Sequence, residues 1–147
     1  GSGDTSSIAL PFINRGGAHL LNSIDSAPTR NLQLKDNIVF NNEYGVHCQA
    51  GDYKCFPNLF DGNMTGNVII GAAQSYRPTC GNPYPAGNSC VSVIDSVGFV
   101  DAARGNYRLA LSSRYKGRAS DGKDPGVDMD ELLRALSAED RLQRNSR

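Results

Sequence analysis

The feature that most restricts the fold of this chain is a pair of similar segments, residues 34–41 and 64–71. Each runs from an apolar residue through polar residues to an asparagine, then through three β-forming residues to a turn residue. The two asparagines, Asn37 and Asn67, are 30 residues apart, which is within the period range of stacked repeat architectures. We therefore expect these segments to stack in parallel as part of a β-solenoid, with Asn37 and Asn67 forming a ladder. The alternative is two unrelated turn asparagines.

Composition supports a single domain built from short strands. The chain has 147 residues, with 16 glycines, 7 prolines and no tryptophan, which favours turns over long helices. Its 15 basic and 15 acidic residues balance, so the sequence gives no sign of a nucleic-acid partner or of a charged membrane partner. No apolar run approaches the ~18 residues of a membrane span.

The four cysteines form two local pairs, each enclosing a polar loop that contains glycine. We predict two disulfides, with free thiols and a metal site as the alternatives; the pairs are Cys48 with Cys55 and Cys80 with Cys90. Disulfides are typical of oxidising compartments, so we expect a secreted or extracellular protein. The polar start of the chain, residues 1–7, resembles a linker or tag remnant rather than a signal peptide.

The last third of the sequence changes from strands to a helix. Asp128 and Glu131 have capping-box spacing, and they precede an apolar face made by Leu132, Leu133 and Leu136. We expect this helix to cover the open final coil of the solenoid, whose strand edges would otherwise be exposed. The predicted organisation is therefore coils with disulfide-bearing loops over residues 8–127, and a capping helix with a basic tail over 128–147.

Six short stretches also match a known pattern; they are Asn37–Asn42, Thr65–Gly71, Tyr84–Asn88, Val97–Asp101, Asn106–Leu109 and Asp121–Asp128. Together they resemble the C-terminal end of secreted bacterial right-handed parallel β-helix repeat proteins, in particular the large acidobacterial ones. The resemblance implies an all-β fold, a right-handed parallel β-helix of few coils with a C-terminal α-helical cap. This fold is shared with pectate-lyase-like enzymes, adhesins and structural exoproteins, so it does not select one function.

Two groups of residues are candidates for chemistry. The first, near the cysteine loops, would contact carbohydrate: Tyr44, His47, Asp52, Tyr53, Lys54, Tyr76 and Tyr84. The second, Asp121, Asp124 and Asp128, would hold calcium in a loose oxygen site, although Lys123 and Pro125 break the EF-hand pattern. The alternatives are solvated loop residues for the first group, and turn and N-cap residues for the second. Apart from calcium, we expect no cofactor.

We expect a non-catalytic structural or interaction module, the C-terminal capping segment of an extracellular β-helix protein. The alternatives are part of a polysaccharide lyase or glycoside hydrolase, or a carbohydrate-binding adhesin, so whether the chain is an enzyme stays open, with the balance against catalysis. The expected partners are upstream β-helix coils or another protein chain at the open N-terminal end, and polysaccharide. We expect neither a nucleic acid nor a membrane as a partner.

Overall fold

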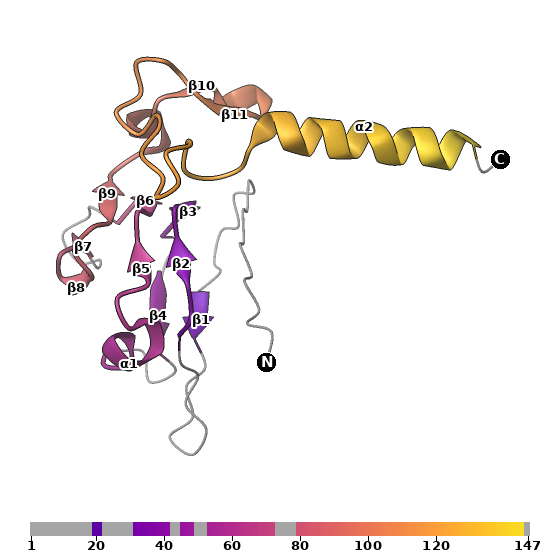
Figure 1. Ribbon diagram of the computed structural model, residues 1–147. Coiled ribbons are helices and arrows are strands. Elements are labelled where there is room, and N and C mark those ends of the chain that lie inside the picture. The colour runs from indigo at the N-terminus through magenta and orange to yellow at the C-terminus, as the bar shows by residue number, and fades with distance from the viewer. Residues whose placement is uncertain (1–18, 22–30, 42–44, 49–52, 73–78, 146–147) are drawn as a thin grey trace.

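The computed structural model describes residues 19–21, 31–41, 45–48, 53–72 and 79–145. Short strands dominate the first two thirds of these residues, and one long helix ends them (Figure 1). In chain order the elements are β1 (His19–Leu21), β2 (Leu34–Lys35), β3 (Ile38–Phe40), β4 (Val46–Cys48), α1 (Phe56–Phe60), β5 (Met64–Thr65), β6 (Val68–Ile70), β7 (Thr79–Cys80), β8 (Pro83–Tyr84), β9 (Ser89–Val91), η1 (Ile94–Val97), β10 (Phe99–Asp101), η2 (Ala102–Arg104), β11 (Asn106–Leu109) and α2 (Met129–Asn145).

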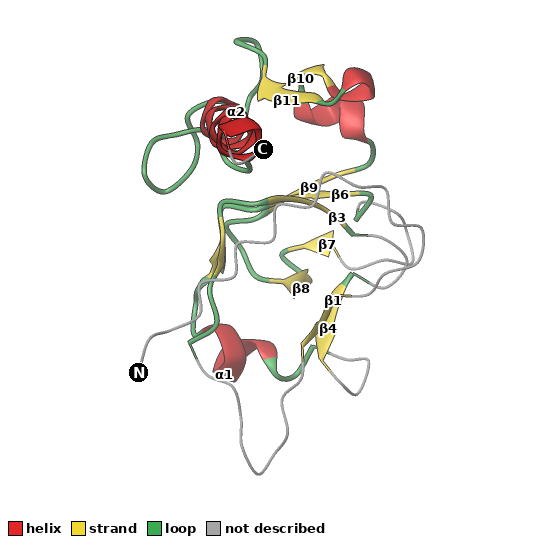
Figure 2. Cartoon of the chain, turned by 90° about the vertical axis from the view of Figure 1, so that its right-hand side faces the viewer, coloured by secondary structure: helices red, strands yellow, loops and turns green. Residues whose placement is uncertain are grey.

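A three-stranded parallel sheet with the order β3-β6-β9 crosses the middle of the molecule (Figure 2). Its register aligns Ile38 with Val68 and Val68 with Ser89. β2 also pairs with β5 in parallel, aligning Leu34 with Met64. The predicted parallel pairing of the two similar segments is therefore confirmed. Separate two-stranded pairs form from β1 and β4, from β7 and β8, and from β10 and β11.

The predicted asparagine ladder is present and has a third member, Asn88. The Asn37 amide donates to Asn67 Oδ1 at 3.1 Å, and the Asn67 amide donates to Asn88 Oδ1 at 2.8 Å. Each asparagine also donates to a backbone carbonyl, as Asn67 does to Leu34 at 2.6 Å. Because Asn67 is only 1% exposed, water cannot reach its side-chain amide, and these bonds supply the hydrogen-bond partners that it needs.

The residue before each ladder asparagine has a left-handed backbone. The φ angles are 57° at Asp36, 71° at Gly66 and 91° at Gly87. A Cβ atom at Gly66 would lie 2.2 Å from Asp36 Oδ1, so this position requires glycine for space as well as for conformation. The same turn therefore leads into β3, β6 and β9.

Strand β6 separates two hydrophobic cores, because its side chains alternate between the two faces of the sheet. Ile69 faces one core, and Val68 and Ile70 face the other. The first core contains the buried residues Val39, Val46, Cys48, Phe56, Leu59, Phe60, Met64, Ile69, Ala72 and Tyr84. The second core contains Val68, Ile70, Val91, Val97, Leu109 and Tyr115.

The expected all-β right-handed parallel β-helix is wrong. The described strands form small separate sheets of two or three strands, parallel and antiparallel, and they do not close into coils. Two features of the chain explain the difference. The ladder offset falls from 30 residues to 21 at its second step, and β10 turns back through η2 to pair with β11 in an antiparallel hairpin.

The expected cap is wrong as well. Helix α2 begins where predicted, but it extends away from the strands instead of covering them (Figure 1). Leu132, Leu133 and Leu136 remain 39%, 45% and 50% exposed. The loop before α2 is held against the turn at Asp36 through a hydrogen bond from Gly126 N–H to the Asp36 carbonyl at 2.7 Å. This contact fixes where the helix begins.

Both predicted disulfides are confirmed, since Cys48 is bonded to Cys55 and Cys80 to Cys90. Each bond closes a short loop beside the first core. Such bonds form in oxidising compartments. Within the described part of the chain, none of the helices combines the length and the apolar character needed to cross a bilayer.

Candidate functional site

Tyr84, one of the predicted sugar-contacting residues, lies inside the first core and is 0% exposed. Its hydroxyl donates to Asn41 Oδ1 at 2.7 Å and accepts from the Val46 N–H at 2.9 Å. Burial raises the pKa of Tyr84 to about 12, although the Val46 hydrogen bond acts in the opposite direction. Tyr84 therefore has a structural role here and presents no surface to a ligand.

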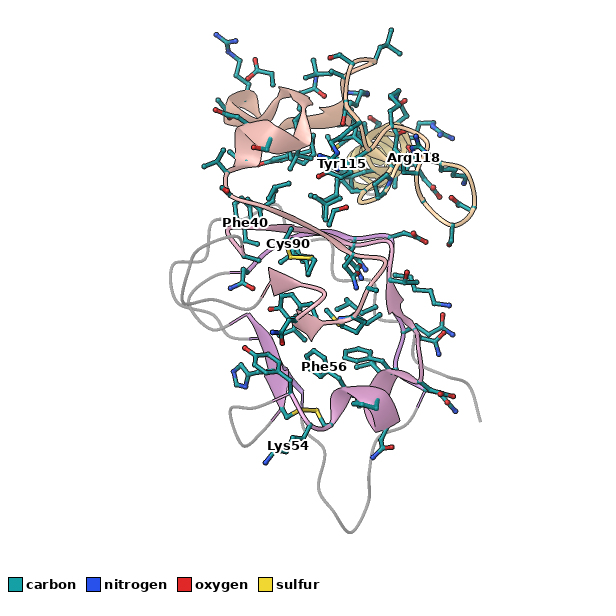
Figure 3. All side chains as sticks on the ribbon, turned by 90° about the vertical axis from the view of Figure 1, so that its left-hand side faces the viewer. Phe40, Lys54, Phe56, Cys90, Tyr115 and Arg118 are labelled. Atoms are coloured by element: carbon teal, nitrogen blue, oxygen red, sulfur yellow. A yellow bond between two sulfur atoms is a disulfide. The ribbon has the colours of Figure 1, made fainter. Side chains whose placement is uncertain are left out.

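The other described members of that group do not form one surface with it. Tyr53 is half-buried, packs edge-on against Phe56 and Tyr84 at 5.4 and 6.2 Å between ring centroids, and has a raised pKa because of burial. Lys54 is exposed and points away from the molecule, whereas Phe56 points inward (Figure 3). His47 is half-buried, with Nδ1 2.7 Å from the Cys48 carbonyl oxygen.

Three of the seven predicted sugar-contacting residues lie outside the described residues; they are Tyr44, Asp52 and Tyr76. Carbohydrate contact therefore stays a prediction, and Tyr84 cannot take part in it in this structure.

The predicted calcium ligands have other partners in the structure. Asp124 Oδ2 accepts from Lys116 Nζ at 2.6 Å, and Asp121 Oδ1 accepts from the Lys123 N–H at 2.9 Å. Asp128 caps α2 by accepting from the N–H groups of Asp130 and Glu131, both at 3.0 Å. These hydrogen bonds, with that of Glu131 the largest influence, lower the pKa of Asp128. Among the described residues no group of three or more histidine, cysteine, aspartate or glutamate side chains is placed to hold a metal.

A polar cleft of about 680 Å³ lies between β11, the loop before α2 and the start of β3. Many of the charged groups in its wall are bonded to one another. Asp36 accepts from the Ser120 hydroxyl and from its N–H, and Arg108 forms an ion pair with Asp130. These bonds connect the loop before α2 and the first turn of α2 to the rest of the molecule. They therefore position the helix.

Helix α2 carries an apolar face that the body covers only at its beginning. The residues of this α2 seam are Met129, Leu132, Leu133 and Leu136, spaced i, i+3, i+4 and i+7. Met129 is half-buried and, with Leu132, lines an apolar cavity against the body. Leu133 and Leu136 line neither cavity, and they are about half exposed. Beyond Leu132, the α2 seam is therefore an exposed apolar surface.

Two asparagines that stabilise the structure around these sites, Asn88 and Asn41, were not predicted from the sequence. Asn88 extends the ladder, and its signal is the Gly–Asn pair that it shares with Gly66–Asn67. Asn41 is 1% exposed and bonds to Tyr84. Nothing local marks Asn41, because its partner is 43 residues away.

Scans of the chain against protein families, curated proteins and solved structures found no match. The resemblance to β-helix repeat proteins therefore has no support beyond the short stretches that suggested it. The function has to be argued from the geometry of this chain.

Proposed function

We propose that this chain is a non-catalytic interaction module of an extracellular protein, and that it pairs with a second copy of itself through the α2 seam. The observation that carries the proposal is the exposure of Leu132, Leu133 and Leu136, at 39%, 45% and 50%, on a helix that extends beyond the body. The two disulfides support an extracellular setting.

The spacing of the seam suits helix pairing. Apolar residues at i, i+3, i+4 and i+7 form a stripe along one side of a helix, and two such stripes pack by inserting side chains into each other's gaps. Met129 anchors the stripe at the body, and Leu136 lies two turns further on. A partner helix would remove the exposed parts of these leucines from water, which is favourable by roughly 25 cal/mol per Å².

The charges along α2 favour a second copy in the antiparallel orientation. The start of the helix is mainly acidic, with Asp128, Asp130 and Glu131 before Arg134. After Glu139 and Asp140, the end of the chain is basic, with Arg141, Arg144 and Arg147. Antiparallel pairing brings the acidic end of one copy near the basic end of the other, and it also opposes the two helix dipoles. In a dimer with a two-fold axis, the seam of one copy packs against the same seam of the other copy.

The seam covers only two helical turns, so the paired state is expected to be weak. Stable dimers bury ~800 Å² on each partner, and a stripe of four side chains provides less. We expect a dissociation constant on the order of micromolar, which is in the range of transient interfaces.

The test is sedimentation velocity of the disulfide-bonded chain at concentrations that span the micromolar range. The wild type is expected to shift from monomer to dimer, and the Leu136→Asp variant is expected to stay monomeric because a carboxylate would be buried in the seam. Ala138→Asp is the matched control, since Ala138 is exposed on the opposite side of α2 and receives the same charge. A wild type that is monomeric throughout, or a Leu136→Asp variant that dimerises like the wild type, would refute the proposal.

A further inference from the structure

A second cavity, with a volume of about 370 Å³, lies between the central sheet and the C-terminal segment. Its walls come from three parts of the chain. Ile38, Phe40 and Ile70 project from β3 and β6, Phe99 comes from β10, and Val127 belongs to the segment that leads into α2. Figure 2 shows this arrangement, with the sheet on one side and β10, β11 and α2 on the other.

The wall of this apolar cavity differs in chemistry from the polar cleft beside it. Aliphatic and aromatic side chains make up most of the apolar cavity's wall, and no aspartate, glutamate, lysine, arginine or histidine of the described chain contributes to it. The polar cleft instead contains both lysines and aspartates, including Lys116 and Asp124. A charged group would lose its hydration on entering the apolar cavity and would find no opposite charge there.

The walls of the apolar cavity are held in place without a ligand. Gly126 lies so close to β3 that a Cβ atom on it would be 3.3 Å from the Ile38 side chain, and its N–H donates to the Asp36 carbonyl. Next to the other wall, which includes Ile94 and Phe99, the Ser113 hydroxyl donates to the Val97 carbonyl at 2.6 Å. The Ala110 N–H also donates to the Gly98 carbonyl at 2.9 Å. A preformed cavity binds at a lower entropic cost than one that must be ordered by its ligand.

We propose that the apolar cavity binds a neutral, mainly hydrocarbon small molecule, with aromatic and aliphatic compounds as the chemical class. The volume falls in the 300–1,000 Å³ range of small-molecule sites, which are concave and mostly apolar. Phe40 and Phe99 offer aromatic surface, and Ile38 and Ile70 offer aliphatic surface. This site shares Met129 and Leu132 with the α2 seam, but Leu133 and Leu136 do not line it. A substitution at Leu136 can therefore separate dye binding from the proposed pairing.

The experiment uses N-phenyl-1-naphthylamine, a neutral aromatic dye whose fluorescence rises in apolar surroundings, titrated into the full disulfide-bonded chain. We expect saturable binding of one dye per chain and displacement by decanol. Its anionic relative anilinonaphthalene sulfonate is expected to bind roughly tenfold more weakly or worse, since a charge is excluded from the cavity.

A pair of substitutions places the dye in the cavity. Val127→Trp fills the site and is expected to weaken binding roughly tenfold or more, whereas Val93→Trp adds the same side chain at a position that is 54% exposed and lines neither cavity. Ile94→Trp fills the cavity from the opposite wall, so a loss of folding in one variant does not decide the result. Circular dichroism checks that each variant is folded.

The outcomes separate the two proposals. Leu136→Asp is expected to bind the dye like the wild type even though its pairing is abolished. Dye binding that is lost in Leu136→Asp but kept in both Val127→Trp and Ile94→Trp would place the dye on the α2 seam and refute the cavity site. Non-saturable binding, or equal binding by Val127→Trp and Val93→Trp, would refute it as well.

Discussion

The two cores on either side of β6 are closed by different means. The first core is bordered by two disulfides and by the asparagine ladder, and it contains a buried hydrogen-bonded pair, Asn41 and Tyr84. The second core has no disulfide beside it in the described chain, and the loop next to it is fastened by exposed ion pairs such as Lys116 with Asp124. The first arrangement resists opening, because a buried polar group cannot be left unpaired without a large cost.

Because of this difference, we expect the region of the first core to provide stability and the region of the second core to provide binding. The polar cleft and the apolar cavity are both lined by residues of the second core, Leu109 in the cleft and Ile70 in the cavity. Helix α2, which carries the seam, lies on the same side of the central sheet as β10 and β11 (Figure 2). In the first core, Tyr84, which was expected to bind sugar, instead bonds through its hydroxyl to the Val46 N–H and to Asn41. We therefore expect substitutions in the first region to change stability, and substitutions in the second to change binding.

The largest stability effect is expected for Asn67→Ala. The substitution leaves the Asn37 N–H and the Leu34 carbonyl without the partner that they have at 3.0 and 2.6 Å, and it interrupts the ladder in the middle. We expect the free energy of unfolding to fall by about 3 kcal/mol, since each orphaned buried group costs ~1–3 kcal/mol. Urea unfolding monitored by circular dichroism measures the loss.

Asn88→Ala is the internal comparison for this prediction. Asn88 is the last member of the ladder and is half-buried, so water can enter the space that its side chain leaves and bond to its former partners, the Asn67 amide and the Met64 carbonyl. Its substitution is expected to cost less than that of Asn67. Equal costs at the two positions would mean that the ladder does not act as a buried, continuous element.

The second effect in size is expected for Tyr84→Phe. Removing the hydroxyl takes away the donor to Asn41 Oδ1 and the acceptor for the Val46 N–H in the first core, and we expect a loss of about 2 kcal/mol in the free energy of unfolding. No comparable loss is expected for Tyr53→Phe, because Tyr53 is only half-buried. A cost at Tyr84 no larger than at Tyr53 would contradict the buried network.

Tyr84 also gives the wild type a pH dependence at alkaline pH. Burial raises its pKa to about 12 from the ordinary tyrosine value of 10.0. Between these values the unfolded chain releases the phenol proton and the folded chain keeps it, so the free energy of unfolding decreases as the pH rises through this window. The Tyr84→Phe variant is expected to show a shallower decrease, measured by urea unfolding at several pH values.

Local patterns in the sequence were enough to predict several parts of this structure. The pairing of Ile38 with Val68 followed from repeated segments, and the disulfides followed from short cysteine spacings. The start of α2 followed from Asp128, whose side chain accepts the first free N–H groups of the helix. Each of these features is encoded within a few residues or in a repeat.

The features that could not be predicted depend on distant contacts. Tyr84 is in a loop rich in proline and glycine, which is typical of the surface, but its hydroxyl reaches Asn41 and Val46 across 43 and 38 residues. The apolar stripe of α2 predicted a buried face without saying what covers it. Its direction is set where Gly126, with a φ of 90°, is bonded to Asp36.

The predicted fold class was wrong for a related reason. A repeat with two copies indicates one stacking step, and it does not show that the next step has the same length. Here the next step is 21 residues long, and the chain then changes to the antiparallel hairpin of β10 and β11. The same change in the path of the chain forms one wall of the apolar cavity. It therefore explains both why the predicted fold class was wrong and why the cavity was not predicted.

The smallest effect is expected for Lys116→Ala, on the side of the second core. Partial burial acts to raise the pKa of Asp124, but the hydrogen bonds from Lys116 and the Gly117 N–H, together with the Lys116 charge, lower it overall. A lowered pKa stabilises the folded chain above the unfolded value of 3.8, and this stabilisation is lost as the pH falls through the folded pKa. Because both side chains are about a third exposed, we expect less than about 1 kcal/mol at pH 7.

Urea unfolding of Lys116→Ala and of the control Lys123→Ala, each at neutral pH and at a pH below the folded-state pKa of Asp124, measures this difference. Lys123 is a neighbouring exposed lysine whose backbone N–H, rather than its side chain, bonds to Asp121. The Lys116→Ala loss should vanish in acid and should shrink with added salt, because the pair is screened. A loss at Lys116 as large as that at Asn67 would contradict the contrast between the two cores, since it would mean that exposed ion pairs hold the second region as firmly as buried amides hold the first.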